Sequence, residues 1–346
     1  LNSSRGWFCF QAVRYYIRSK FWQAIYKKLG ITMLWTMFDV DPEKLIKTQA
    51  LELVNGLYLG SHWSNFPKYR IDNQKCYDVL FTWGKHFISS NFSNYPYMAA
   101  FITGYPSDHY FLTRMTLADE MKRSLKDKFV ISFQDNMIAS DILYSKGMQV
   151  AVHRMLIDML LNDNRLILLL KPKRKYIFEQ ILAELPELQS LIDADRVKVF
   201  LGETVRSKAV PAEIGKASDL VIGLGISTTA AECCFAGTVS FHADLTGFKD
   251  NAFGNAGLNK VVFRDINSLR SAIQSQINGQ GITIEECRKY HKMLDPFQDG
   301  QAYKRTGAII GALQKELASG LSRLDAVKKV QQRYNKFSAV KEEVLV

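Results

Sequence analysis

Residues 224–232 hold the groups best suited to chemistry in this chain. They read LGISTTAAE and directly follow Asp219–Gly223, a short apolar stretch typical of a buried strand. A glycine lets the backbone approach a ligand closely, and the amides that open a helix attract an anion. The order of strand, glycine turn, hydroxyl residues and helix therefore predicts a phosphate site. Its residues would be Gly225, Ser227, Thr228 and Thr229.

Glu232 extends this prediction to a nucleoside. Thr228 and Glu232 are four residues apart and would share one face of a helix. A phosphate bound at Thr228 would place a ribose near Glu232, whose carboxylate accepts hydrogen bonds from the sugar hydroxyls. The alternative is a capping box from Thr229 to Glu232, in which the carboxylate satisfies only backbone amides. Short motifs often match by chance, so the local pattern leaves both interpretations open.

Two other predicted strands also end in polar residues. Lys171 and Lys173 follow the apolar run RLILLL, and Gln134 follows FVISF, with an Asp and an Asn next in the chain. The plain alternatives are a solvated helix start for the lysines and a turn with a helix cap for Gln134. Three polar strand ends on one edge of a sheet favour a pocket, in which the two lysines would face a diphosphate. The dinucleotide fingerprint and the P-loop lysine pattern are both missing from the sequence.

Short apolar runs alternate with helix-like segments from Phe129 onward. This alternation predicts an α/β fold with a parallel, doubly wound sheet, in which ligands bind beyond the carboxyl ends of the strands. In the first part of the chain, only Ile31–Phe38 and Tyr77–Trp83 have the pattern of strands. The strands expected after them are Phe129–Phe133, Arg165–Leu170, Val197–Leu201, Asp219–Gly223, Thr238–His242 and Lys260–Phe263.

Length and charge set further limits on function. The chain has 346 residues, enough for two domains, and Lys and Arg exceed Asp and Glu by 45 − 34 = 11. This basic surplus favours an anionic partner, and without a nucleic-acid signature we expect a nucleotide and a membrane surface rather than DNA or RNA. No run approaches the roughly 18 apolar residues of a membrane-spanning helix, and no secretory signal is visible. The five cysteines show no metal-ligand spacing. We therefore expect a cytoplasmic protein without a metal.

Residues 1–30 combine aromatic and basic side chains, among them Trp7, Phe8, Phe21 and Arg14. Their apolar positions fall near helical spacing. One interpretation is an amphipathic helix that lies on anionic lipid, which would make the protein peripheral on the inner membrane. The other is a helix packed on its own domain, and the sequence leaves both open.

Four stretches carry a resemblance to a known family. They are SDLVIGLGISTTAAE at 218–232, KPK at 171–173, DVLFTWG at 78–84 with TGYPSD at 103–108, and DPFQDGQA at 295–302 with Arg305. On these residues the chain resembles bacterial surface-polysaccharide glycosyltransferases of the GT-B type. It is most similar to the lipopolysaccharide and capsule proteins described by a Pro-Phe-Thr-Ser motif, and more distantly to glycerophosphotransferases of teichoic-acid synthesis. The sequence departs from that pattern in having GIST at 225–228, and Lys173 where a histidine is frequent.

The resemblance implies two Rossmann-like domains. Residues 1–112 would form the acceptor-side domain, 113–320 the donor-binding domain, and 321–346 a C-terminal helix. The first domain is shorter than is usual in the family, so we expect one or more leading βα units to be absent from it.

The resemblance also implies a reaction, the transfer of a sugar from a nucleotide diphosphate to a growing surface polysaccharide or lipid-linked glycan, without a cofactor. Ser227, Thr228 and backbone amides would hold the phosphates, and Glu232 the ribose. Lys171 and Lys173 would neutralise the charge that develops on the leaving diphosphate.

An inverting transfer needs a general base, which the N-terminal domain would supply. The candidates are His62, in the segment GSHWSN, and Asp39, which follows the strand predicted at Ile31–Phe38. A histidine titrates near neutral pH, but one beside a tryptophan is often structural.

Two other functions stay open. One is a non-catalytic scaffold of a polysaccharide assembly complex. The other is a nucleotide-sugar epimerase, which would need a cleft rich in carboxylates and histidines. The donor half offers only His153, His242 and His291, which are scattered in the sequence.

Overall fold

The structure is a computed structural model that describes residues 4–37, 43–62, 64, 77–89, 97–113, 116–136, 144–201, 210–247 and 252–342. The chain forms two compact units. Unit 1 comprises residues 1–63, 67–106 and 301–346, and unit 2 comprises residues 64–66 and 107–300. We predicted a donor domain over 113–320, whereas helix α14 (Ala302–Ala318) lies in unit 1.

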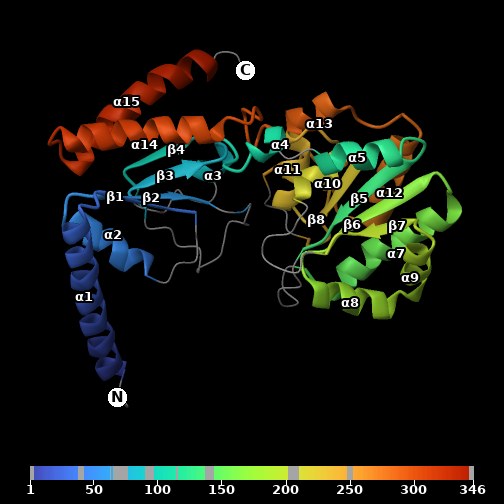
Figure 1. The fold of residues 1–346 in the computed structure, drawn as a ribbon, viewed down its shortest axis with the longest axis horizontal. Helices are drawn as coiled ribbons and strands as arrows, with labels where there is room; N and C mark the ends of the chain where they lie inside the picture. Colours follow the sequence, from blue (N-terminus) through green and yellow to red (C-terminus); the bar gives the residue numbers. More distant parts are fainter. Residues whose placement is uncertain are drawn as a thin grey trace. The chain divides into compact units, whose positions relative to one another are not determined.

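Unit 1 contains a four-stranded parallel sheet in the order β1-β2-β3-β4. Figure 1 shows α14 on one face of this sheet and α2 on the other. The apolar side chains of α14 and α15 that face the sheet, among them Leu313 and Val327, pack on Leu59 and Phe81. The elements are α1 (Ser4–Leu29), β1 (Met33–Thr36), α2 (Lys44–Glu52), β2 (Leu57–Ser61), β3 (Val79–Thr82), α3 (His86–Ser89), β4 (Ala99–Ile102), α14 and α15 (Arg323–Glu342).

A buried ion pair fixes α15 to this sheet. Arg323, at the start of α15, contacts the carboxylate of Asp78, which directly precedes β3. The other oxygen of Asp78 accepts a hydrogen bond from the backbone amide of Tyr58 at 2.8 Å. Burial raises the pKa of Asp78 above its ordinary value, and Arg323 opposes that rise. The C-terminal helix is thus an integral part of unit 1.

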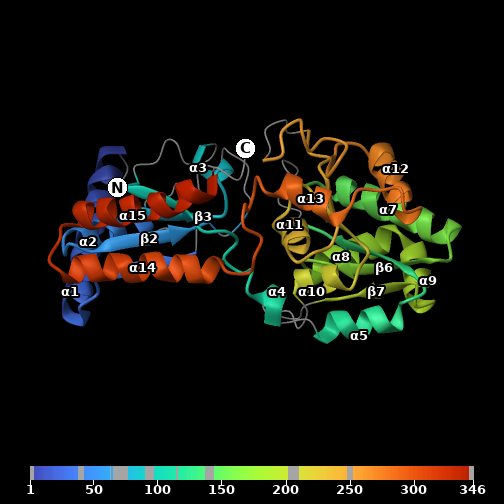
Figure 2. The ribbon, with the colours of Figure 1, turned by 90° about the horizontal axis from the view of Figure 1, so that it is seen from above.

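Unit 2 contains six parallel strands in the order β10-β9-β8-β5-β6-β7. Figure 2 shows α5 and α10 on one face of the sheet and α7 with α12 on the other. The elements are α4 (Tyr110–Thr113), α5 (Thr116–Ser124), β5 (Phe129–Gln134), α7 (Lys146–Asn162), β6 (Leu166–Lys171), α8 (Lys175–Glu184), α9 (Pro186–Asp193), β7 (Val197–Val199), α10 (Pro211–Lys216), β8 (Leu220–Leu224), α11 (Thr228–Phe235), β9 (Ser240–Ala243), β10 (Val262–Phe263), α12 (Ile266–Ile277) and α13 (Ile284–His291).

This strand order is that of a Rossmann fold. The first strand of the unit, β5, pairs with β6 on one side and with the fourth, β8, on the other. The direction of winding reverses between β5 and β8, and ligands of such sheets bind beyond the carboxyl ends of the strands at that point. The predicted doubly wound α/β fold is confirmed. Each of the six strands predicted in unit 2 is present, with ends shifted by at most two residues.

Helix α1 is unusually exposed. Its second half contacts α2, where Arg18 pairs with Glu43 and Trp22 Nε1 donates to the same carboxylate at 3.1 Å. Its first half extends away from α2 and the sheet in Figure 1. Among the described residues, no helix has the length and apolar character needed to cross a bilayer.

Candidate functional site

The turn after β8 has a backbone that only glycine adopts easily. Gly225 has φ +68°, and a Cβ at this position would lie 2.2 Å from the ring of Tyr144. Burial, followed by the nearby charge of Asp244, raises the pKa of Tyr144 to about 12, so its phenol stays protonated. Gly225 is therefore required both by the turn and by the aromatic ring that packs on it.

Ser227 caps helix α11. Its backbone is extended (φ −89°, ψ 146°), and its Oγ accepts a hydrogen bond from Ala230 N at 3.3 Å. The same oxygen lies 3.2 Å from Thr229 Oγ1, and Thr228 Oγ1 lies 3.1 Å from the hydroxyl of Ser64. The predicted strand, glycine turn and helix start are confirmed, with three hydroxyl side chains gathered at the helix N-terminus.

Glu232 does not complete the capping box that we considered as an alternative. The N-cap of α11 is Ser227 rather than Thr229. Glu232 is buried, and its Oε1 accepts a hydrogen bond from the backbone amide of Ala212, in the first turn of α10, at 3.2 Å. Glu232 thus links α11 to the start of the neighbouring helix, and its predicted ribose contact stays a prediction.

Gln134 lies inside unit 2. It is 1% exposed, and its Nε2 donates to the carbonyl of Pro211 and to Cys233 Sγ, both at 3.2 Å. Its side chain is the last of β5 and points under helix α10. These bonds hold α10 and α11 to the sheet and give no support to the predicted contact with a nucleotide.

The next residue, Asp135, forms a charged cluster with the two predicted lysines. Asp135 Oδ1 accepts from the backbone amide of Lys173 at 2.6 Å, and Lys173 Nζ donates to Asn136 Oδ1 at 3.2 Å. Lys171 is half-buried and forms no salt bridge within the described residues. Asn136 Nδ2 in turn donates to the carbonyl of Leu224, 3.5 Å away, which joins this cluster to the turn after β8.

Burial controls the titration of this cluster. Desolvation raises the pKa of Asp135 from 3.8 to about 7, although the Lys173 amide and the two ammonium groups oppose the rise. Desolvation also lowers the pKa of both Lys171 and Lys173 below the ordinary lysine value. The cluster has a surplus of at least one positive charge, and an anion would relieve the cost of burying it.

These groups meet at one edge of one sheet. Lys171 ends β6, Asp135 follows β5 and Gly225 follows β8, and these three strands are adjacent. The helix dipole of α11 adds partial positive charge at Ser227. Cations, hydroxyls and a helix N-terminus at the reversal point of the sheet are the groups that bind a diphosphate. The sequence predicted the lysines and the turn at this edge, but of the polar residues after FVISF it favoured Gln134 over Asp135 as the ligand contact.

The two proposed general bases belong to unit 1. His62 is 1% exposed, its Nε2 accepts from Trp83 N at 3.1 Å, and its ring stacks on Trp83 with centroids 4.6 Å apart. This arrangement is that of a structural histidine and offers no support for a catalytic role. Asp39 lies outside the described residues.

The start of the segment at 295–302 forms a turn. Asp295 is fully buried, and its Oδ1 accepts from the backbone amides of Phe297 at 2.8 Å and Gln298 at 3.2 Å. Arg305, in α14, donates from Nε to the carbonyl of Thr103 at 2.8 Å. Asp295 thus fixes the backbone of unit 2, and Arg305 that of unit 1.

Comparison with known proteins supports the fold. No protein-family model and no curated protein sequence matches this chain. Among solved structures, it is similar to a UDP-GlcNAc 2-epimerase from Neisseria meningitidis bound to UDP-GlcNAc (TM-score 0.58, 11% identity, 87% of this chain and 81% of that one). It is equally similar to S. aureus MnaA in a structure with UDP (TM-score 0.58, 11% identity, 90% and 82%).

A third similar structure is the wall teichoic acid polymerase TagF (TM-score 0.51, 13% identity, 84% of this chain and 74% of that one). At these identities the likeness concerns the fold alone. The chain has the two-unit Rossmann-type architecture of GT-B-like proteins, as the sequence predicted.

Proposed function

We propose that this protein binds a nucleoside-diphosphate sugar at the carboxyl edge of the unit 2 sheet and transfers the sugar to an acceptor hydroxyl. The observation that carries the proposal is the meeting of Lys171, Lys173 and the N-terminus of α11 where the winding of the sheet reverses. Bond cleavage leaves negative charge on a diphosphate, and positioned cations stabilise that charge most where water is partly excluded.

The individual roles follow from this placement. Ser227, Thr228 and the first amides of α11 would contact the phosphates, and the lysines the leaving oxygen. The ribose contact of Glu232 competes with its bond to the Ala212 amide, so it needs a separate test. For the acceptor base we favour Asp39, because the Nε2 of His62 already accepts a backbone hydrogen bond. We propose a glycan or lipid-linked acceptor and no metal at this site.

An epimerase is the second candidate function. It is favoured by the likeness to the epimerase of N. meningitidis, whose TM-score of 0.58 exceeds the 0.51 for TagF. Epimerisation at carbon requires a base that removes a proton from the sugar, and it needs no acceptor. An epimerase would need histidines that line an open cleft. His153 and His242 are instead buried, at 2% and 0% exposed.

Calorimetric titration tests donor binding directly. UDP-, GDP-, CMP- and dTDP-sugars should be titrated into the wild type and into a Lys171→Gln/Lys173→Gln variant. Each lost charge-assisted hydrogen bond weakens binding by about 1.5–3 kcal/mol, or roughly 10-fold to 100-fold. Lys175→Gln is the matched control, because Lys175 is close in the chain and has the same charge, but its side chain is exposed and pairs with Glu179.

The outcomes separate the candidates. Donor binding with nucleotide release only when a glycan acceptor is added supports the transferase. Interconversion of two sugar epimers without an acceptor supports the epimerase. If no nucleotide sugar binds, the non-catalytic scaffold is the remaining function. If the Lys175→Gln control loses as much donor affinity as the double variant, the net charge of the protein, rather than this site, binds the donor.

We also propose that α1 contacts an anionic membrane surface. The helix contains no acidic residue and has basic residues along its length. Large apolar side chains are exposed in its first half, including Trp7 at 53% and Phe8 at 68%. Such a surface suits the lipid interface, where aromatic rings insert and basic groups meet headgroups. A lipid-linked acceptor would be reached there.

Vesicle sedimentation tests this contact. The wild type should pellet with phosphatidylglycerol vesicles and less with phosphatidylcholine, and a Trp7→Ser/Phe8→Ser variant should lose most of this binding. Tyr176→Ser/Tyr303→Ser is the control, since these rings are 52% and 50% exposed on other helices. Equal binding of both variants would overturn the assignment of the contact to α1.

A further inference from the structure

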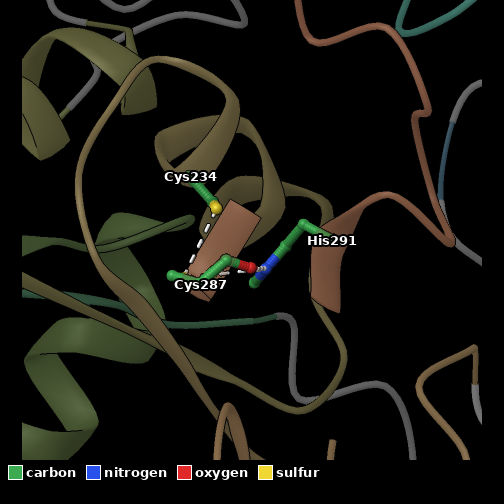
Figure 3. A group of neighbouring side chains, drawn as sticks. All are labelled: Cys234, Cys287 and His291. Carbon is green, nitrogen blue, oxygen red and sulfur yellow. Dashed lines mark hydrogen bonds between the residues drawn. The ribbon is translucent and has the colours of Figure 1, made fainter. Parts of the chain in front are cut away.

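Two cysteines and two histidines form a buried cluster in unit 2, away from the charged groups described above. Cys234 comes from α11, Cys287 and His291 from α13, and His242 from β9. All four are 0% exposed. Figure 3 shows the side chains of Cys234, Cys287 and His291 pointing toward one another. The sequence shows no metal-ligand spacing and its histidines are scattered, because only the fold brings these residues together.

The distances in the cluster fit a tetrahedral metal site. The sulfurs of Cys234 and Cys287 are 3.4 Å apart, and Cys287 Sγ lies 3.7 Å from His291 Nδ1. All three ligand atoms lie within 4.8 Å of one another. With Zn–S bonds of about 2.3 Å and Zn–N bonds of about 2.0 Å, two sulfurs would be about 3.8 Å apart and a sulfur and a nitrogen about 3.5 Å. The two sulfur distances of Cys287 differ from these by a few tenths of an ångström.

The histidine protons show which ring nitrogen is available to bind a cation. His242 Nδ1 lies 3.2 Å from the carbonyl of Gly225, which can only accept, so this nitrogen carries the proton of a neutral ring. His242 Nε2 is then bare, and it lies 3.1 Å from His291 Nε2, which must supply the proton of that bond. The proton of His291 is thereby used, and its Nδ1 is left as a bare lone pair.

That lone pair needs a proton donor or a metal ion. His291 Nδ1 lies 2.9 Å from the carbonyl of Cys287, an acceptor, and otherwise faces the Cys287 sulfur. Moving the proton to Nδ1 would instead leave two bare Nε2 atoms 3.1 Å apart. In the assignment that satisfies His242, His291 Nδ1 is thus open to an electrophile, either a metal ion or the thiol proton of Cys287.

We propose that Cys234, Cys287 and His291 bind one zinc ion that fastens α13 to α11. Zinc accepts this mixture of sulfur and imidazole ligands. Binding releases the two thiol protons, and the two thiolates neutralise the charge of the ion, so that no net charge is buried. The carbonyl oxygen of Ser240, 3.6 Å from Cys287 Sγ, is one candidate for a fourth ligand.

His242 then completes the site as an outer partner. A metal-bound histidine usually donates its other N–H to a second group, which fixes its tautomer. Here His291 Nε2 donates to His242, and His242 donates to Gly225 O. The ion would stabilise the turn after β8 through this chain of bonds. The zinc proposal depends only on these contacts and stands or falls separately from nucleotide binding.

Metal analysis of the full chain tests the proposal. The untagged protein, purified without chelators, should contain one zinc per chain by elemental mass spectrometry. Protein refolded with Co²⁺ should show the intense visible bands of tetrahedral cobalt and a thiolate charge-transfer band. Both signals should disappear in Cys287→Ser and in His291→Ala, and His291→Cys should restore them. Cys233→Ala is the matched control, because Cys233 is equally buried in α11 but donates to Pro211 O.

Several results would overturn it. One is a wild-type chain that folds without metal and takes up neither Zn²⁺ nor Co²⁺ on refolding. Another is a disulfide between Cys234 and Cys287 in the purified protein. A third is an equal loss of metal in Cys233→Ala. If Cys287→Ser does not fold, the wild-type metal content, the cobalt spectrum and the His291→Cys variant still decide the question.

Discussion

Asp135→Asn should abolish a large pH dependence in the stability of unit 2. The pKa of this buried carboxyl is raised from 3.8 to about 7, so the folded state holds a proton that the unfolded state has lost. The contribution of Asp135 to the free energy of unfolding is therefore largest below pH 4 and falls steadily up to about pH 7. Asparagine keeps an oxygen for the Lys173 amide and does not ionise.

The expected size follows from the shift itself. Each pKa unit corresponds to 1.36 kcal/mol, and a rise of about three units gives about 4 kcal/mol between pH 4 and pH 8. The free energy of unfolding of Asp135→Asn relative to wild type should therefore increase by about this amount over that interval. Taking the difference between the two proteins removes the contributions of all other titrating groups.

The assay must report on unit 2. All five tryptophans lie at or before Trp83, outside unit 2, so their fluorescence follows unit 1 and serves as an internal control. Hydrogen exchange of peptides that cover β5 and β6, measured across urea concentrations at each pH, gives the stability of the sheet around Asp135. Asp163→Asn is a second control, because the hydrogen bonds to Arg165 lower the pKa of Asp163 and its substitution should act weakly and in the opposite direction.

Parallel stability curves for wild type and Asp135→Asn from pH 4 to pH 8 would refute this reasoning. They would mean that Asp135 ionises as it does in water, so that its neighbourhood is hydrated. The cluster would then hold no desolvated charge for an anion to relieve.

Three further predictions concern other positions. Gly225→Ala should lower stability by about 1–3 kcal/mol in thermal unfolding, because it adds strain and a clash, whereas Gly254→Ala, at φ +52° with open space around it, should lose less. Glu232→Ala should lower the free energy of unfolding by about 1–3 kcal/mol, because the Ala212 amide loses this acceptor. Glu232→Gln should fold nearly normally and weaken donor binding by a similar amount. If the melting temperature of Glu232→Gln collapses while its affinity is unchanged, Glu232 serves the fold alone. Arg323→Met should lower the free energy of unfolding of unit 1 by about 3–5 kcal/mol in urea, because the buried carboxylate of Asp78 loses its partner. A loss below about 1 kcal/mol would show that water replaces the guanidinium.

The fold was predictable where local patterns suffice. Apolar runs of about five residues separated by helices identified every strand of unit 2, whereas β2 and β4 of unit 1 were missed. Strand β2 follows Asn55-Gly56, a turn signal, and contains Gly60, which interrupts its apolar pattern. The structure explains Gly60: a Cβ there would lie 2.3 Å from the ring of Tyr77, a contact that no local pattern reveals.

The candidate site was predictable to within one residue. Successive side chains of a strand point to opposite faces, so the choice between Gln134 and Asp135 depends on where the strand ends. We predicted an end at Phe133, but β5 continues to Gln134, and this places Gln134 under α10 and Asp135 beside the lysines. The cysteine and histidine cluster was beyond prediction, because Cys234 and Cys287 are 53 residues apart.

The division of the chain between its two units has a consequence for synthesis on the ribosome. Apart from the short segment 64–66, unit 2 is one continuous stretch, whereas the core of unit 1 needs Leu313 and Val327 from the last part of the chain. Unit 2 can therefore fold while translation continues, but the strands of unit 1 must wait, with one face uncovered, until α14 and α15 emerge. Chaperones that shield nascent chains would therefore be needed longest on the strands of unit 1, which are made well before α14 and α15.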